Sequence, residues 1–135
     1  MMLVDASVWV AAGAPADTYH RDSRRLTQEG VGSIAVLDLT LYEVANTVGV
    51  KYGQPLEAQS LGQAIITCCD ADRIVRMNQD LLSATISVAG KYGLTSYDAA
   101  YVAAAERYGW QLVSLDMRDL VSKGLAVTPD AAVYP

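Results

Sequence analysis

Residues 2–7 read Met-Leu-Val-Asp-Ala-Ser, an apolar run of three side chains that ends in a carboxylate. A short run without polar residues is typical of a strand that is buried on both faces of a parallel sheet. Similar runs recur along the chain and alternate with longer segments of helical character. The predicted strands are Met2–Asp5, Ser33–Leu37, Arg73–Met77, Gln111–Leu115 and Leu125–Val127. This alternation predicts an α/β fold with a central parallel sheet of four to five strands.

The segments between these runs carry helical signals. In Leu41–Lys51 the apolar side chains recur at helical spacing, and Asp98–Tyr108 is rich in alanine, so its backbone can lie close to a neighbour. The predicted helices are Asp17–Glu29, Leu41–Lys51, Leu56–Cys68, Leu81–Lys91 and Asp98–Tyr108. Right-handed crossovers between parallel strands place such helices on both faces of the sheet. We therefore expect three layers, α/β/α.

Length and composition limit the class of protein. The 135 residues are 52% hydrophobic and 19% charged, which excludes a disordered chain and predicts a single domain over residues 1–135. No uncharged stretch approaches the roughly 18–20 apolar residues of a membrane span, and the start of the chain lacks the basic region of a secretory signal. The only cysteines, Cys68 and Cys69, are adjacent and form a poor disulfide. A cytoplasmic protein without a membrane partner is expected.

The charge balance narrows the function. Ten Lys and Arg stand against 15 Asp and Glu, a net charge of −5, which excludes a nucleic-acid binder that relies on a basic patch alone. A single histidine, His20, and two adjacent cysteines leave no Cys/His zinc site. Arg21, Arg24 and Arg25 share one side of a predicted helix, where a solvated face is the simpler interpretation. The eight tyrosines, in a chain without phenylalanine, are expected mostly in the core.

Four carboxylates fall where strands and helices meet: Asp5, Glu43, Asp98 and Asp116. Each has a purely structural interpretation. Glu43 and Asp98 each follow a threonine by three residues, the capping-box spacing, and Asp5 and Asp116 could cap the segments that follow them.

Their common location favours a second interpretation. The carboxyl ends of parallel strands share one edge of the sheet, where ligands bind. Four carboxylates in one crevice would raise one another's pKa unless a cation were bound between them. Oxygen ligands suit a hard ion, Mg²⁺ or Mn²⁺.

Four motifs support this interpretation. Leu-Val-Asp-Ala-Ser (3–7), Tyr-Glu-Val-Ala-Asn (42–46), Ser-Tyr-Asp-Ala-Ala-Tyr (96–101) and Leu-Val-Ser-Leu-Asp (112–116) occur in this order. Together they resemble a PIN domain, and more narrowly a VapC-type toxin of a bacterial toxin–antitoxin pair. The resemblance extends from Met2 to about Val127 and is loosest over residues 56–77.

The resemblance implies a strand order of 3-2-1-4-5 and a specific site. Its acidic metal site would consist of Asp5, Glu43, Asp98 and Asp116, with Asp119, Ser114, Ser7 and Asn46 as auxiliary residues. It further implies a Mg²⁺-dependent endoribonuclease in which Mn²⁺ can substitute. A VapB-type antitoxin would be its partner, and the protein would form a homodimer, or a heterotetramer or larger assembly with the antitoxin. With the four site acids set aside, 11 acids of the 15 remain against ten basic residues, so an acidic chain does not argue against an RNA substrate.

Two other function classes stay open from the residues alone. An aspartate-based phosphatase also starts with an Asp after the first strand, but it usually needs Asp-x-Asp, and this chain has Ser7 at the second position. A non-catalytic interaction module would use the acids only as caps. Metal titration separates such a module from the nuclease.

Overall fold

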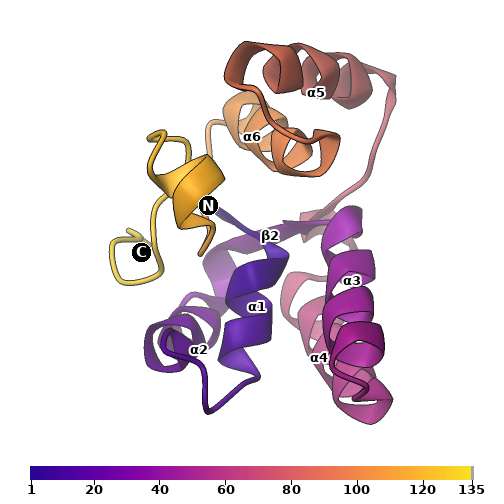
Figure 1. The fold of residues 1–135 in the computed structure, drawn as a ribbon, viewed down its shortest axis with the longest axis vertical. Helices are drawn as coiled ribbons and strands as arrows, with labels where there is room; N and C mark the ends of the chain where they lie inside the picture. The colour runs from indigo at the N-terminus through magenta and orange to yellow at the C-terminus, as the bar shows by residue number, and fades with distance from the viewer. Residues whose placement is uncertain (135) are drawn as a thin grey trace.

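A computed structural model describes residues 1–134 of the chain (Figure 1). The strands are β1 (Met2–Val4), β2 (Ile34–Leu37), β3 (Ile74–Val75) and β4 (Gln111–Val113). The α-helices are α1 (Ala6–Ala12), α2 (His20–Glu29), α3 (Asp38–Val44), α4 (Pro55–Cys69), α5 (Gln79–Tyr92) and α6 (Ser96–Tyr108). The remaining helical segments are two π-helices, η2 (Ala45–Lys51) and η4 (Met117–Val121), and two short 3₁₀ turns, η1 (Val31–Ser33) and η3 (Ala71–Arg73).

The strands form one parallel sheet in the order β3-β2-β1-β4. Strand β1 lies inside the sheet, with Met2 paired to Ile34 on β2 and to Gln111 on β4. The predicted α/β fold and its parallel sheet are confirmed. The predicted fifth strand is reduced to a single parallel bridge between Val113 and Val127 at the outer edge of β4.

Helices cover both faces of the sheet. Figure 1 shows α5 and α6 on one side of the sheet and α1 to α4 on the other. Along β1 the side chains alternate between the two layers: Leu3 packs with the alanines of α6, whereas Met2 and Val4 pack with Val8 and Trp9 of α1. Because both faces are covered, all three residues of β1 are buried, as its apolar run predicts.

Helices α1 and α3 begin at residues that the sequence did not predict, and α2 begins at His20 rather than Asp17. Helix α1 was not predicted, because its residues, Ala-Ser-Val-Trp-Val-Ala-Ala, are largely buried and have no charged face to reveal the helical period. Helix α3 begins at Asp38 rather than Leu41. Glu43 therefore lies in the last turn of α3, and the predicted capping box with Thr40 is wrong. The hydroxyl of Thr40 instead accepts a hydrogen bond from the N–H of Leu37, at 3.2 Å.

The expectation that most tyrosines lie in the core is also wrong. Tyr101 is fully buried, but five others are exposed on the surface: Tyr19, Tyr42, Tyr52, Tyr97 and Tyr108. A tyrosine ring is largely apolar, with one polar hydroxyl group, so an exposed tyrosine offers an apolar face to a ligand or a partner. Among the described residues, no helix combines the length and the apolar character that crossing a membrane requires.

Candidate active site

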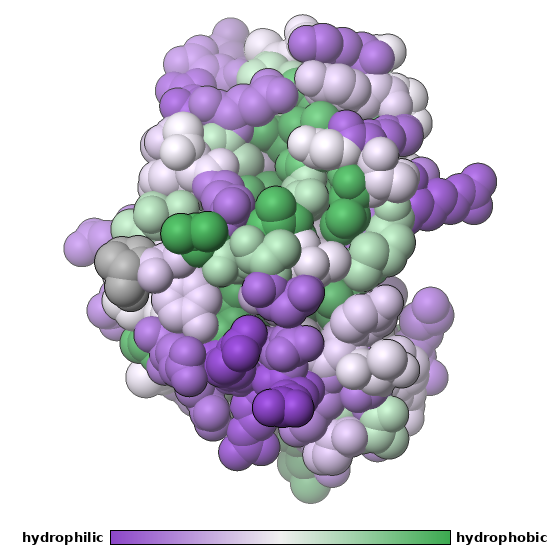
Figure 2. Space-filling model, turned by 90° about the vertical axis from the view of Figure 1, so that its left-hand side faces the viewer, coloured by the Kyte–Doolittle hydropathy of each residue, from purple (hydrophilic) through white to green (hydrophobic). Residues whose placement is uncertain are grey.

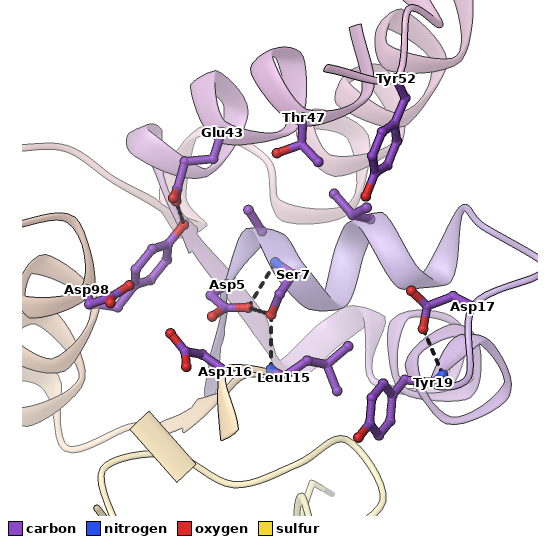
Figure 3. Close-up of a pocket in the computed structure, with 13 residues that line it drawn as sticks. Asp5, Ser7, Asp17, Tyr19, Glu43, Thr47, Tyr52, Asp98, Leu115 and Asp116 are labelled. Carbon is purple, nitrogen blue, oxygen red and sulfur yellow. Dashed lines mark hydrogen bonds between the residues drawn. The ribbon is translucent and has the colours of Figure 1, made fainter. Parts of the chain in front are cut away.

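A pocket of about 390 Å³ opens at the carboxyl ends of β1 and β4 (Figure 3). All four acids singled out in the sequence line it, and each comes from a different segment. Asp5 follows β1, Glu43 lies in α3, Asp98 lies in the first turn of α6, and Asp116 is the third residue after β4. Among the described residues that line the pocket there is a fifth acid, Asp17, and no lysine or arginine. The pocket therefore concentrates negative charge without a cationic side chain to balance it.

Asp5 is both a helix cap and a wall of the pocket. Its Oδ1 accepts hydrogen bonds from the N–H groups of Ser7, at 3.0 Å, and Val8, at 3.4 Å, and from the hydroxyl of Ser7. The other carboxylate oxygen points toward Asp98 and Asp116 in Figure 3. Burial raises the pKa of Asp5 to about 6, although hydrogen bonds with the two serine hydroxyls and with Val8 oppose the shift. The carboxyl is thus held by its cap and disfavoured as an anion by its surroundings.

Two of the predicted auxiliary residues, Ser7 and Ser114, hold the acids in place. The hydroxyl of Ser7 donates to Asp5 and accepts from the N–H of Leu115, at 3.0 Å, so it joins the end of β1 to the end of β4. Ser114 is completely buried, and its Oγ accepts a hydrogen bond from the N–H of Asp116, at 3.0 Å. Both serines act through the acids rather than at the pocket's centre.

Glu43 is oriented by a buried relay of hydroxyl groups. The hydroxyl of Tyr101 donates to Oε1 of Glu43, at 2.6 Å, and lies 2.8 Å from the hydroxyl of Thr40. Because Tyr101 donates its only hydroxyl proton to Glu43, the hydroxyl of Thr40 donates to Tyr101. The sequence analysis missed both Thr40 and Tyr101. The sequence feature that could have identified them is their position one helical turn from a site acid. Thr40 lies three residues before Glu43, and Tyr101 lies three residues after Asp98.

The ionisation of this pair is set by burial. Burial raises the pKa of Glu43, the nearby charge of Asp98 adds to the rise, and the hydrogen bond from Tyr101 opposes it. Burial raises the pKa of Tyr101 well above its usual value, and the charge of Glu43 contributes. Tyr101 therefore keeps its proton and remains a donor to Glu43.

Three carboxylates come close enough to share one cation. Asp98, Asp116 and Asp119 each offer an oxygen within 4.8 Å of the other two. Oδ1 of Asp116 accepts from the N–H of Asp119, at 2.9 Å, so Asp116 also caps the π-helical segment η4. Burial raises the pKa of Asp98, the charges of Asp116 and Asp119 raise it further, and Thr95 and Lys123 oppose the rise. This donor set, oxygen only and short of positive charge, fits Mg²⁺ or Mn²⁺.

The structure groups the acids differently from the sequence prediction. Asp119, predicted as auxiliary, belongs to the three-carboxylate group. Asp5 and Glu43 line the pocket together with Asp98 and Asp116 but lie outside that group.

Asn46 does not reach the pocket, contrary to the prediction that it supports Glu43 there. It is exposed and lies with Tyr42 and Tyr97 in a separate hollow on the other side of Glu43. Thr47 lines the pocket instead. The reason is local: the segment after Val44 is a π-helix, whose wider turn brings the residue four positions on, rather than three, toward the face of Glu43.

The far end of the pocket was not foreseen. Tyr52 stands at the end of η2, while Asp17 and Tyr19 lie in the turn before α2. No periodic pattern or motif marked these residues, because they lie in turns. The arginines Arg21, Arg24 and Arg25 are exposed on α2 and do not line the pocket. The lower part of the surface in Figure 2, where α2 lies, is hydrophilic.

Comparison with known proteins gives a consistent result. The PIN domain model matches residues 2–122. Ribonuclease VapC3 of Pyrobaculum aerophilum is 35% identical over 133 residues, which are 95% of this chain and 98% of that protein.

Two solved structures share the fold at 19% identity. The first, VapC20 of Mycobacterium tuberculosis, described as a sarcin–ricin loop cleaving toxin, aligns with a TM-score of 0.76 over 94% of this chain and 97% of its own. The second, a toxin–antitoxin complex from Klebsiella pneumoniae, aligns with a TM-score of 0.72 over 96% of this chain and 98% of that chain. The family match over most of the chain and the similarity to VapC3 agree with the sheet order and with the acids at its edge. This chain belongs to the PIN-domain family and, within it, to the VapC proteins.

Proposed function

We propose that this protein is a metal-dependent endoribonuclease that acts in the cytoplasm as the toxin of a type II toxin–antitoxin pair. The observation that carries the proposal is the convergence of Asp98, Asp116 and Asp119, whose carboxylate oxygens lie within 4.8 Å of one another. Membership of the PIN-domain family and the similarity to a VapC ribonuclease support the same activity.

The proposed metal is Mg²⁺, with Mn²⁺ as a substitute. Asp98, Asp116 and Asp119 would hold it, and Asp5 would complete the set through the oxygen that its cap leaves free. A divalent cation bound there would activate a water molecule for attack and neutralise charge on the phosphate. Compared with the sequence prediction, this assignment gives Asp119 a direct role.

The protein's own groups account for the remaining requirements. Oε1 of Glu43 accepts the hydrogen bond from Tyr101. Oε2 is therefore left to take a proton from a water molecule that enters the pocket. The raised pKa of Glu43 suits a proton acceptor in this position. Ser7 joins the end of β1 to the end of β4 through the N–H of Leu115, and Ser114 holds the backbone of Asp116 just after β4.

The test combines metal binding with RNA cleavage. Cleavage of an RNA pool should stop in EDTA and return with Mg²⁺ or Mn²⁺, and Mn²⁺ binding, followed by electron paramagnetic resonance, should be lost in Asp98→Asn. Asp72→Asn, a change at an exposed aspartate in η3, serves as the matched control. Cleavage that persists in EDTA, or equal Mn²⁺ binding by both variants, would refute the proposal.

The same test separates the alternatives. If the protein were a pure interaction module, the Asp98→Asn and Asp72→Asn variants would bind Mn²⁺ equally well. An aspartate-based phosphatase gains no support, because the hydroxyl of Ser7 is bonded to Asp5 and Leu115 at the position where that chemistry needs a second carboxyl.

We further propose a VapB-type antitoxin as the partner. One protein of the same fold is described as a toxin–antitoxin complex. A pocket of five acids without a lysine or arginine complements a guanidinium group, which pairs with carboxylates through two parallel hydrogen bonds. An arginine of the antitoxin would therefore insert among Asp5, Asp98 and Asp116 and compete with the metal.

A homodimer is proposed from a separate surface. Exposed apolar side chains gather around a hollow of about 280 Å³ between the start of α3, α5 and α6. They are Tyr42, Met77, Leu82, Ile86 and Tyr97. A patch of this kind on a small protein marks an interaction site. A second copy would bury it, and two antitoxin chains would complete a heterotetramer or a larger assembly.

A further inference from the structure

We propose that the end of the pocket away from the three-carboxylate group is a base-recognition subsite, which takes one unpaired guanine close to the cleaved bond. Its residues are Asp17, Tyr19, Thr47 and Tyr52, and it is called the tyrosine end below. This inference rests on the proposed ribonuclease activity and adds which base the site selects and how.

The tyrosine end is continuous with the acidic end. All four of its residues line the same pocket as Asp5, Asp98 and Asp116. Figure 3 shows the acidic group on one side of the pocket and Asp17, Tyr19 and Tyr52 on the other, with α1 between them. An RNA strand whose phosphate lies at the acids can therefore bring a neighbouring base to the tyrosines.

The backbone that carries the two rings is anchored by hydrogen bonds. The N–H of Tyr52 bonds to the carbonyl oxygen of Thr47 at 3.0 Å, and Gly53, with a φ of 62° that favours glycine, turns the chain away immediately afterwards. The N–H of Tyr19 bonds to Oδ1 of Asp17 at 2.8 Å. Tyr52 is nevertheless 58% exposed and Tyr19 39% exposed. Each tyrosine therefore has an anchored backbone and a side chain that is partly exposed to an incoming base.

The charge of the pocket explains why aromatic rings are needed. Among the described lining residues there are five acids and no lysine or arginine, so cationic side chains cannot hold the RNA backbone there. Stacking of a base on an aromatic ring requires no cation and strengthens binding to single strands. The tyrosine end can supply the attraction that the acidic end cannot.

Asp17 determines which base fits. One of its oxygens is bonded to Tyr19, and the other points toward the side of the pocket where Tyr52 lies (Figure 3). A carboxylate only accepts hydrogen bonds. Guanine alone presents two adjacent donors, N1–H and the 2-amino group, on its Watson–Crick edge, whereas the other bases place an acceptor beside their donor. That edge is free only in an unpaired base, so the subsite selects loops and single strands over duplex.

The experiment uses cleavage of a random-sequence RNA pool, with sequencing of the cut sites. For the wild-type protein we expect guanine to be enriched at one fixed position within about three nucleotides of the cut. Asp17→Asn retains an oxygen for the N–H of Tyr19 but replaces one acceptor by a donor. It should remove the enrichment, by roughly 5- to 150-fold in relative kcat/KM for guanine, while cleavage itself continues.

The aromatic contribution is measured on the same pool. Tyr52→Leu should lower kcat/KM for all cut sites through a higher KM, and Tyr52→Phe should restore it, because the ring and not the hydroxyl stacks. Tyr108→Leu, at an exposed tyrosine that packs on Trp110 and does not line the pocket, is the control and should change neither quantity.

The outcomes distinguish this inference from the proposed activity. Absence of any metal-dependent cleavage by the wild type overturns the ribonuclease proposal and this subsite with it. Cleavage without guanine enrichment, enrichment that survives Asp17→Asn, or a Tyr52→Leu effect no larger than that of Tyr108→Leu overturns the subsite alone.

Discussion

Replacing Asp5 by Asn should make the metal-free protein more stable while it abolishes cleavage. Asp5 is 6% exposed, and burial raises its pKa from 3.8 to about 6. A shift of about 2 pH units corresponds to about 3 kcal/mol of preference for the neutral form in the folded protein. Because the folded state binds the proton more tightly than the unfolded state, this stabilisation is present below pH 3.8 and is lost as the pH rises through about 6. At pH 7.5 the ionised carboxyl therefore destabilises the metal-free fold.

Asn at position 5 stays neutral at every pH and keeps an oxygen for the N–H groups of Ser7 and Val8, so the cap of α1 is retained. In EDTA at pH 7.5 we expect the variant to gain about 2–3 kcal/mol, or roughly 5–10 °C in Tm. The gain should shrink toward zero near pH 4. Added Mn²⁺ should raise the Tm of the wild type more than that of the variant, because a ligand stabilises in proportion to its affinity for the folded state.

The assay is thermal and urea unfolding followed by circular dichroism, over pH 4–8, in EDTA and in Mn²⁺. Asp72→Asn, at an exposed aspartate, is the control and should change stability by less than about 0.5 kcal/mol. A loss of stability in Asp5→Asn at pH 7.5 without metal would show that the carboxylate stabilises the fold. A gain that did not depend on pH would equally contradict burial as the cause.

Three further predictions concern the relay, the antitoxin and the dimer. Tyr101→Phe should destabilise the fold by about 1–2 kcal/mol, because the hydroxyl proton of Thr40 and Oε1 of Glu43 both lose their bond to Tyr101. It should also move the acidic limb of the pH–rate profile to higher pH, since the lost hydrogen bond lowered the pKa of Glu43. An unchanged profile would exclude Glu43 as the titrating group. Raising Mg²⁺ should weaken antitoxin binding in calorimetry, and an antitoxin whose inserted arginine is replaced by alanine should no longer inhibit; inhibition that survives both changes would locate it elsewhere. Ile86→Glu should convert a dimer to a monomer in sedimentation analysis, whereas Glu57→Gln, at an exposed position on α4, should not.

The sheet was predictable because strands buried on both faces leave a direct trace in the sequence. Within the predicted strands Met2–Asp5 and Gln111–Leu115, the runs Met-Leu-Val and Leu-Val carry no polar residue, and both predicted segments contain strands of the structure. Helix α1 escaped for the same physical reason: it is buried deeply enough to lack a polar face. The run at Leu125–Val127 was apolar enough to suggest a strand, but it pairs with β4 at one residue only.

The acids were predictable from where strands end, and the supporting serines Ser7 and Ser114 from the family resemblance, but the groups that hold Glu43 were not. Asp5 and Asp116 are fixed by chain position, since each lies just beyond a strand. The bond from Tyr101 to Glu43, in contrast, joins residues 58 positions apart and depends on how α6 packs beside α3. That Thr47 lines the pocket in place of Asn46 depends on a π-helical segment that no sequence pattern predicts. Tertiary packing decided each of these.

The structural and functional interpretations of the acids turn out to be compatible, and the hydrogen bonds show how. In Asp5 and in Asp116, Oδ1 accepts hydrogen bonds from backbone N–H groups at the start of a helical segment. A carboxylate has a second oxygen, so a cap does not exhaust its capacity to bind. The backbone bonds anchor the like charges side by side, which repulsion alone would separate, and burial keeps the pKa of Asp5 raised despite them. In this arrangement the helix termini provide the geometry of the site, and a cation removes the electrostatic penalty that the geometry creates. A site of this kind should therefore be more rigid than its negative charge suggests and should gain more stability from a divalent metal than a surface cluster of equal charge.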